Sequence, residues 1–237
     1  MDSLYIVMPA YNEEENMENV VRQWYPILKD KDRKSRLVVA DSGSQDDTHK
    51  ILQKLQTELP QLEILVDTEK QHGPKVLALY KYAIAHGADY IFQTDSDGQT
   101  NPAEFEAFWN MRKNYDAVIG NRVVRGDGKV RGFVEWVVCF LLYLFFGVKV
   151  PDANAPFRLM KADIVKKYIG RLPEDYNIPN IMFTTYFVHY KEKVAFKEIT
   201  FKPRQGGVNS INIPRIIEIG WKAMGDFIKF KKDMKNG

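Results

Sequence analysis

Short apolar runs alternate with polar segments and helix-type patterns through the first half of the chain. The runs with the length and density of buried strands are 4–8, 37–40, 62–66, 90–94 and 116–120. Between them, apolar residues recur at helical spacing over 20–28, 51–55 and 76–85, and Asn101-Pro102 has the residues that open a further helix. This alternation predicts an α/β fold with a mostly parallel, twisted central sheet flanked by helices, which binds ligands at the carboxyl ends of its strands.

Two helical segments in the second half of the chain have a different pattern. Residues 132–148 are apolar nearly all round, and such a helix needs either a protein core or lipid around it. At about 1.5 Å per residue, the apolar run 136–148 would measure roughly 20 Å, short of the roughly 30 Å core of a bilayer. Residues 214–230 are amphipathic and lysine-rich at their end, which suits an anionic membrane surface; docking on the domain is the equal alternative.

Composition and charge exclude several classes of protein. The chain has 237 residues, of which 45% are hydrophobic and 27% charged, as is typical of a globular domain. The net charge of +3 is too close to neutral to favour nucleic acid as a partner, although Lys229, Lys231, Lys232 and Lys235 gather near the end. Cys139 is the only cysteine, which excludes an intrachain disulfide and a cysteine-based zinc site and fits a reducing compartment.

Three polar loops follow predicted strands and are expected to meet at one edge of the sheet. They are Pro9-Ala-Tyr-Asn-Glu-Glu14, Asp41-Ser-Gly-Ser44 and Asp95-Ser-Asp-Gly-Gln99. The chain has neither the glycine-rich dinucleotide fingerprint nor the Walker lysine loop, so a nicotinamide oxidoreductase or a P-loop NTPase is not predicted.

The aspartates of the third loop are candidate metal ligands. In an extended segment, alternate side chains point to the same side, so Asp95, Asp97 and Gln99 can face one cation. Mg²⁺ or Mn²⁺ is the natural occupant when one or two carboxylates and the phosphates of a substrate complete the coordination. The alternative is a solvated turn that caps the helix after Asn101.

The other two loops hold candidate contacts to a nucleoside. Asp41 at the end of its strand can accept hydrogen bonds from a ribose or a base, and Tyr11 can pack flat against a base. The alternatives are a helix cap, a role that Asp46 or Asp47 could take instead, and plain packing of the tyrosine.

The motifs occur in an order that resembles a known family. Pro9-Ala-Tyr-Asn-Glu13, Asp41-Ser-Gly-Ser-x-Asp46-x-Thr48, Asp95-x-Asp97, Gly120-x-Arg122 and Phe157-Arg158 are similar to the motifs of family 2 glycosyltransferases of GT-A (Rossmann-like) fold. More narrowly, the chain resembles the polyprenyl-phosphate sugar synthases of the dolichyl-phosphate mannose synthase type. It departs from their pattern at Gln71–Val76, which includes Lys75, and at Pro156.

The resemblance implies a role for each candidate residue. Pro9, Tyr11, Glu13 and Asp41 would contact the nucleoside, Asp95 and Asp97 would hold the diphosphate and its metal, and Gln99 would be a third metal ligand. Arg122, Arg158 and Arg204 would face phosphates and, with Asp97, form the catalytic set. We expect a catalytic domain over 1–212, including the apolar helix 132–148, and a basic amphipathic helix and tail over 213–237, both helices being interfacial.

The predicted activity is the inverting transfer of a hexose from a UDP- or GDP-linked sugar to polyprenyl phosphate at the cytoplasmic face of a membrane. A lipid phosphate is already ionised near neutral pH, because its second pKa is about 6, so it needs no strong general base. A sugar hydroxyl would need one, and Glu174 and Asp175 are the local candidates. Two alternatives remain: transfer to a lipid-linked saccharide in cell-surface polysaccharide synthesis, and a non-catalytic nucleotide-sugar-binding or scaffold protein. The expected partners are the membrane surface and either a second copy or a membrane protein.

Overall fold

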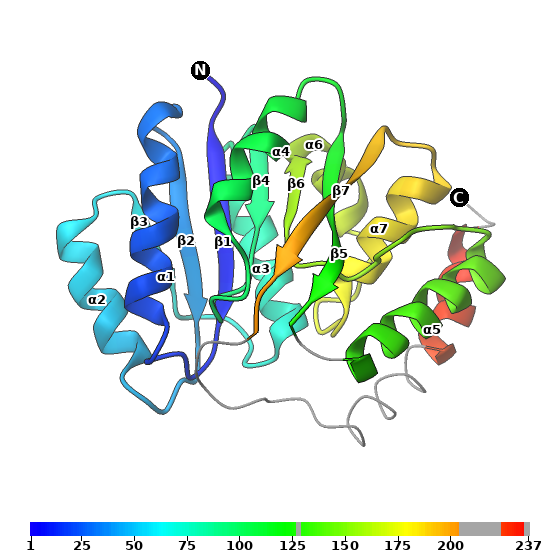
Figure 1. Cartoon of the computed structure of the whole chain (residues 1–237), viewed down its shortest axis with the longest axis horizontal. Helices are drawn as coiled ribbons and strands as arrows, with labels where there is room; N and C mark the ends of the chain where they lie inside the picture. Colours follow the sequence, from blue (N-terminus) through cyan, green and yellow to red (C-terminus); the bar gives the residue numbers. More distant parts are fainter. Residues whose placement is uncertain (127–128, 204–223, 235–237) are drawn as a thin grey trace.

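A seven-stranded sheet forms the centre of the computed structural model, which describes residues 1–126, 129–203 and 224–234 (Figure 1). The strands are β1 (Leu4–Ala10), β2 (Arg36–Asp41), β3 (Leu62–Leu65), β4 (Tyr90–Gln93), β5 (Ala117–Arg125), β6 (Arg158–Lys161) and β7 (Val194–Phe201). Their spatial order is β3-β2-β1-β4-β6-β5-β7, and every neighbouring pair is parallel except those of β6, which runs antiparallel to β4 and β5. The predicted mostly parallel sheet is therefore confirmed.

Helices cover both faces of the sheet and bury a separate core on each. One face is covered by α1 (Met17–Trp24), the 3-10 helix η1 (Tyr25–Asp30), α2 (Thr48–Glu58), the 3-10 helix η2 (Pro102–Glu104) and α4 (Phe105–Met111). The other face is covered by α3 (His72–Ala85), α5 (Lys129–Phe146), α6 (Ala162–Ile169), α7 (Pro179–His189) and a helix over 224–234. Every residue of β1 is buried, because helices cover both of its faces, which explains its continuous apolar run.

Two strands of the sheet were not predicted. β6 has only four residues, and one of them is Arg158. β7 lies at an edge of the sheet, and its residues are mostly half-buried or exposed, so Lys197 and Glu198 interrupt its apolar pattern. β5 also continues beyond the predicted end at Gly120 to Arg125, where it pairs with β7.

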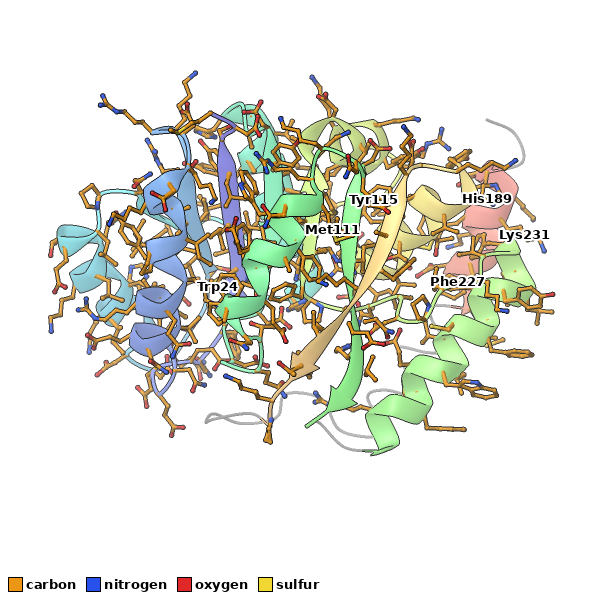
Figure 2. The ribbon with its side chains drawn as sticks, turned by 45° about the horizontal axis from the view of Figure 1, so that its top comes forward. Trp24, Met111, Tyr115, His189, Phe227 and Lys231 are labelled. Atoms are coloured by element: carbon orange, nitrogen blue, oxygen red, sulfur yellow. The ribbon has the colours of Figure 1, made fainter. Side chains whose placement is uncertain are left out.

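The helix over 224–234 packs against the domain. The Phe227 ring lies 6.0 Å from the ring of Phe145 and 5.5 Å from that of Phe146 on α5, between ring centroids. Phe230 contacts Tyr176 edge-on at 5.2 Å. Figure 2 shows Phe227 and Lys231 on this helix beside α5. Residues 224–234 of the predicted C-terminal helix therefore dock on the domain, which was one of the two predicted alternatives. Residues 213–223 lie outside the described residues.

The outer face of α5 carries a stripe of exposed apolar side chains. Its members are Phe133, Trp136, Phe140, Tyr143 and Leu144, and each is more than half exposed. Trp136 stacks with Phe133 at 6.0 Å and with Phe140 at 5.9 Å. In the part of the chain that the structure describes, none of the helices has the length and hydropathy required to span a membrane.

Candidate donor site

The loops after β1 and β2 hold each other at the carboxyl edge of the sheet, which is the lower edge in Figure 1. The backbone N–H of Asn12 donates to Ser44 Oγ at 3.0 Å, and the side-chain oxygen of Asn12 accepts from the N–H of Gln45 at 2.8 Å. The N–H of Glu13 donates to Thr48 Oγ1 at 2.8 Å. Asn12 has a φ of 53°, a conformation that asparagine tolerates better than most residues. The hydrogen bonds therefore fix the shape of this part of the edge.

Asp41 ends β2 with its carboxylate almost fully buried. Its two oxygens contact Ser44 Oγ at 2.5 Å and His49 Nδ1 at 3.2 Å. The capping alternative does not apply to Asp41, because Asp46 accepts the N–H of Thr48 at the start of α2. Glu13, a second predicted nucleoside contact, is also buried and accepts from Asn16 Nδ2 at 3.0 Å.

Lys75 joins this group, although its segment departs from the family pattern and no role was predicted for it. Its Nζ donates to the carbonyl of Ala10 at 2.5 Å and lies 5.3 Å from the centroid of the Tyr11 ring, which is 39% exposed. Burial lowers the pKa of Lys75 to about 8, and the charge of Asp41 opposes that shift. A lysine is thus placed between the first two loops.

Gly73 explains how the first turn of α3 reaches this edge. A Cβ at this position would lie 2.3 Å from the carbonyl oxygen of Tyr176 and 2.5 Å from the backbone of Asn177. Only glycine permits so close an approach of two backbones.

Asp95 and Asp97 follow β4 and are both partly exposed, while Ser96 between them is buried. The Ser96 hydroxyl donates to the carbonyl of Pro9 at 2.9 Å, which ties this loop to the end of β1. Asp97 accepts from the backbone N–H of Gln99 at 3.0 Å. The predicted alternation is therefore present, with two carboxylates on the outer side of one short segment.

The donor set fits a hard divalent cation completed by phosphate oxygens. Carboxylates are the ligands that Mg²⁺ and Mn²⁺ prefer, and one or two of them suffice when a substrate supplies phosphates. Within residues 1–126, 129–203 and 224–234, no cluster of three or more acidic, histidine or cysteine side chains forms a metal site. The helix that follows this loop is capped by Asn101 and not by the aspartates, because the Asn101 side chain accepts from the N–H of Ala103 at 3.2 Å.

Gln99 uses its side-chain amide to hold the end of β7. Its Nε2 donates to the carbonyl of Lys202 at 2.7 Å, and the backbone carbonyl of Gln99 accepts from the N–H of Lys202 at 2.8 Å. The buried side chain of Gln99 therefore connects the aspartate loop to the segment that follows β7, a role that the predicted metal ligation did not include.

Arg122 lies in a cluster of buried charges. Its guanidinium binds Asp152 in a bidentate manner at 2.7 and 2.8 Å and reaches Glu135 on α5 at 3.1 Å. Glu135 also accepts from the N–H of Ala153 at 2.7 Å. This arrangement differs from the predicted phosphate-facing arginine, because carboxylates already contact the guanidinium.

Arg158 requires a correction. Its side chain is completely buried, and its guanidinium donates to the carbonyls of Ala153, Ala155 and Asn180 and to Thr184 Oγ1 over 2.9 to 3.4 Å. These contacts engage the nitrogen atoms within the core, so the structure does not bring Arg158 to a phosphate. The third predicted arginine, Arg204, lies outside the described residues.

The two candidate bases are exposed, and one of them has a cationic partner. Glu174 forms an ion pair with Lys81 at 2.5 Å, and this contact lowers the pKa of Glu174. Lys81 lies nine residues beyond His72 along α3, roughly 13 Å from the end of the helix that reaches the site. Asp175 is exposed next to Glu174.

Several known proteins are similar to this chain in sequence. Undecaprenyl-phosphate mannosyltransferase from Micrococcus luteus is 25% identical over 68% of this chain and 67% of its own length. UDP-N-acetylglucosamine–dolichyl-phosphate N-acetylglucosaminyltransferase from Methanococcus voltae is 28% identical over 69% and 71%. The undecaprenyl-phosphate 4-deoxy-4-formamido-L-arabinose transferase from Pseudomonas syringae is 24% identical over 68% of this chain, but the match covers only 48% of that relative.

A solved structure has the same fold. Glucosyl-3-phosphoglycerate synthase from Mycobacterium tuberculosis in complex with uridine diphosphate superposes with a TM-score of 0.68 at 17% identity, covering 98% of this chain and 80% of the other. The same enzyme has been solved with Mn²⁺, uridine-diphosphate-glucose and glycerol 3-phosphate. This likeness confirms the predicted α/β fold of GT-A type.

The sequence model of glycosyl transferase family 2 matches residues 5–169, a stretch that runs from the second residue of β1 through β6 and contains all three loops of the site. The resemblance to polyprenyl-phosphate sugar synthases is confirmed by the relatives named above. The chain therefore belongs to glycosyl transferase family 2.

Proposed function

We propose that this protein transfers a hexose from a UDP-linked sugar to polyprenyl phosphate, with inversion at the anomeric carbon, at the cytoplasmic face of a membrane. The observation that carries the proposal is the pair of partly exposed carboxylates, Asp95 and Asp97, beside the group formed by Tyr11, Asp41 and Lys75. The relatives named for undecaprenyl- and dolichyl-phosphate support the acceptor, and the uridine diphosphate complexes of the structural neighbour support the base.

Each residue of the site has a defined task in this reaction. Asp41 accepts hydrogen bonds from the nucleoside, and Tyr11 packs on the base with Lys75 near its ring. Asp95 and Asp97 would hold Mg²⁺ or Mn²⁺, which supplies charge neutralisation for the departing diphosphate. The acceptor phosphate attacks in line from the side opposite the diphosphate, which inverts the anomeric centre.

The acceptor determines whether a general base is needed. A phosphate oxygen is already a charged nucleophile near neutral pH, whereas a sugar hydroxyl must lose its proton in the reaction. We therefore expect Glu174→Gln and Asp175→Asn enzymes to keep their rate of transfer to polyprenyl phosphate within about threefold. The measurement is the rate of lipid-linked sugar formation, and a thousandfold loss in either variant would assign that residue as a base.

The function itself is tested by nucleotide release from UDP-sugars with Mn²⁺ or Mg²⁺, with and without polyprenyl phosphate. Release that requires both the cation and the lipid phosphate supports the proposal. Release that requires a lipid-linked saccharide instead would assign the second acceptor class. Binding of UDP without any release in the presence of either acceptor would assign a non-catalytic role.

We also propose that the exposed stripe on α5 contacts the membrane that holds the acceptor. Aromatic side chains such as Trp136 favour the interfacial zone of a bilayer, and exposed apolar patches mark contact surfaces. The Trp136→Ser and Phe140→Ser double variant should lose at least about tenfold in binding to anionic vesicles, measured by flotation. The control is Val66→Ser, which removes an exposed apolar side chain outside α5 and outside the C-terminal helix. Equal flotation of the double variant and of this control would contradict the contact.

A further inference from the structure

A network of buried polar side chains lies directly behind the aspartate loop. Gln93 at the end of β4 is completely buried, and so is Tyr80 on α3. Asn180, in the first turn of α7, is 3% exposed. The Tyr80 hydroxyl lies 3.0 Å from both Gln93 Oε1 and Asn180 Oδ1, and Asn180 Nδ2 donates to Gln93 Oε1 at 2.8 Å. Side chains from a strand and two helices therefore meet at one amide.

The contacts determine which way the amide of Gln93 is turned. Burial raises the pKa of Tyr80, so its hydroxyl keeps its proton and donates. Asn180 Nδ2 donates to one atom of this amide at 2.8 Å, so that atom is the carbonyl oxygen of Gln93. The single proton of the Tyr80 hydroxyl is shared between this oxygen and Asn180 Oδ1, each 3.0 Å away. The NH₂ group of Gln93 is then directed the other way, where Nε2 lies 3.5 Å from Oδ1 of Asp95.

Burying these polar groups costs free energy unless they form hydrogen bonds with one another. An apolar side chain at this position of β4 would fill the same space without that requirement. The partners of Gln93 are satisfied within the network, and its remaining donor faces a carboxylate of the candidate site. Residues that form a hydrogen bond to a metal ligand without touching the metal orient that ligand toward the cation. Their loss typically weakens metal binding tenfold to a hundredfold.

We propose that Gln93 is a positioning residue that orients the carboxylate of Asp95 toward the cation, and that Tyr80 and Asn180 fix Gln93 in the required rotamer. The proposal rests on the proposed function, because it assumes that Asp95 is a metal ligand. It adds to that function a set of residues that do not touch the substrate.

The test is the affinity of Mn²⁺ for the full chain saturated with UDP, measured by electron paramagnetic resonance of the free ion. We expect Gln93→Leu to weaken Mn²⁺ binding tenfold to a hundredfold and Tyr80→Phe to weaken it about threefold to tenfold. Binding of uridine, which has no phosphate, should stay unchanged in both variants. The concentration of Mn²⁺ that gives half-maximal transfer should rise by the same factors.

Tyr82→Phe is the matched control, because Tyr82 lies on the same helix and its hydroxyl bonds to Glu63 instead. This variant loses a tyrosine hydrogen bond from the same helix and should keep the Mn²⁺ affinity of the wild type. Thermal unfolding of all three variants separates a loss of stability from a loss of metal binding. If Gln93→Leu does not fold, the test is the difference in Mn²⁺ affinity between Tyr80→Phe and Tyr82→Phe.

The outcomes separate this proposal from the proposed function. Wild-type protein that transfers sugar with Mn²⁺, together with network variants whose Mn²⁺ affinity lies within about twofold of the wild type, would overturn the positioning role and leave the function standing. Wild-type protein that binds UDP but no Mn²⁺ would overturn the metal site and, with it, both proposals.

Discussion

Asp97→Asn is expected to reduce the rate of sugar transfer by about a thousandfold or more while leaving the fold intact. The amide keeps an oxygen that can accept the N–H of Gln99, so the local hydrogen bond at 3.0 Å survives. The negative charge, however, is lost from a site that has to hold a divalent cation. Charge stabilisation by such a cation is worth several kcal/mol in the transition state, and about 4 kcal/mol corresponds to a thousandfold in rate.

The measurement is kcat/KM with Mn²⁺ in excess, together with the thermal midpoint of unfolding. Asp163→Asn is the control, because Asp163 is an exposed aspartate in the first turn of α6, on another part of the domain. Transfer by Asp97→Asn within tenfold of the wild-type rate, or turnover that persists in a chelator, would show that this carboxylate does not hold a catalytic cation.

The second large effect is on stability. Arg158→Leu is expected to lower the free energy of unfolding by about 3 kcal/mol, because it leaves the buried carbonyls of Ala153, Ala155 and Asn180 without this donor. Each buried acceptor without a partner costs about 1 to 3 kcal/mol. Thr184 Oγ1 still contacts the carbonyls of Ala153 and Asn180 at 2.9 Å, and the removal of a buried charge offsets a further part of the cost. The protein that remains folded should keep a kcat within about tenfold of the wild type.

Urea denaturation measures this difference, with Arg22→Leu as the matched substitution. Arg22 pairs with Glu18 and Glu58 at the surface, where an ion pair contributes about 0 to 1 kcal/mol. If Arg158 contacted a phosphate, its variant would instead unfold like the wild type and lose kcat, which is the opposite pattern.

The parallel half of the sheet and the aspartate loop could be predicted because their signals are local. β1 and β2 are buried on both faces, so their runs are continuous, and the alternation of Asp95, Ser96 and Asp97 follows from the period of an extended chain. The predicted N-cap at Asn101 is confirmed for the same reason, since a cap depends on a few neighbouring residues.

The remaining features depend on contacts between distant segments. The pair Phe157-Arg158 does not reveal which way the arginine points, and that direction is set by α7 and by the loop at 153–155. Lys75 reaches the site because Gly73 lets α3 approach residues 176 and 177. The amphipathic pattern near the C-terminus fits lipid and protein equally well, and the contacts of Phe227 with α5 and of Phe230 with Tyr176 distinguish the two for residues 224–234.

The hydrogen bonds between the loops after β1 and β2 have a consequence for donor recognition. Because Asn12 and Glu13 are already held by Ser44 and Thr48, the walls around Asp41 exist before any nucleotide arrives. These loops therefore lose little conformational entropy when the nucleotide sugar binds. The fit between the base and the loops is then expected to decide which base is bound. A pyrimidine and a purine differ in size by a whole ring, so loops that are held in place before binding are expected to favour one of them rather than adjust to both.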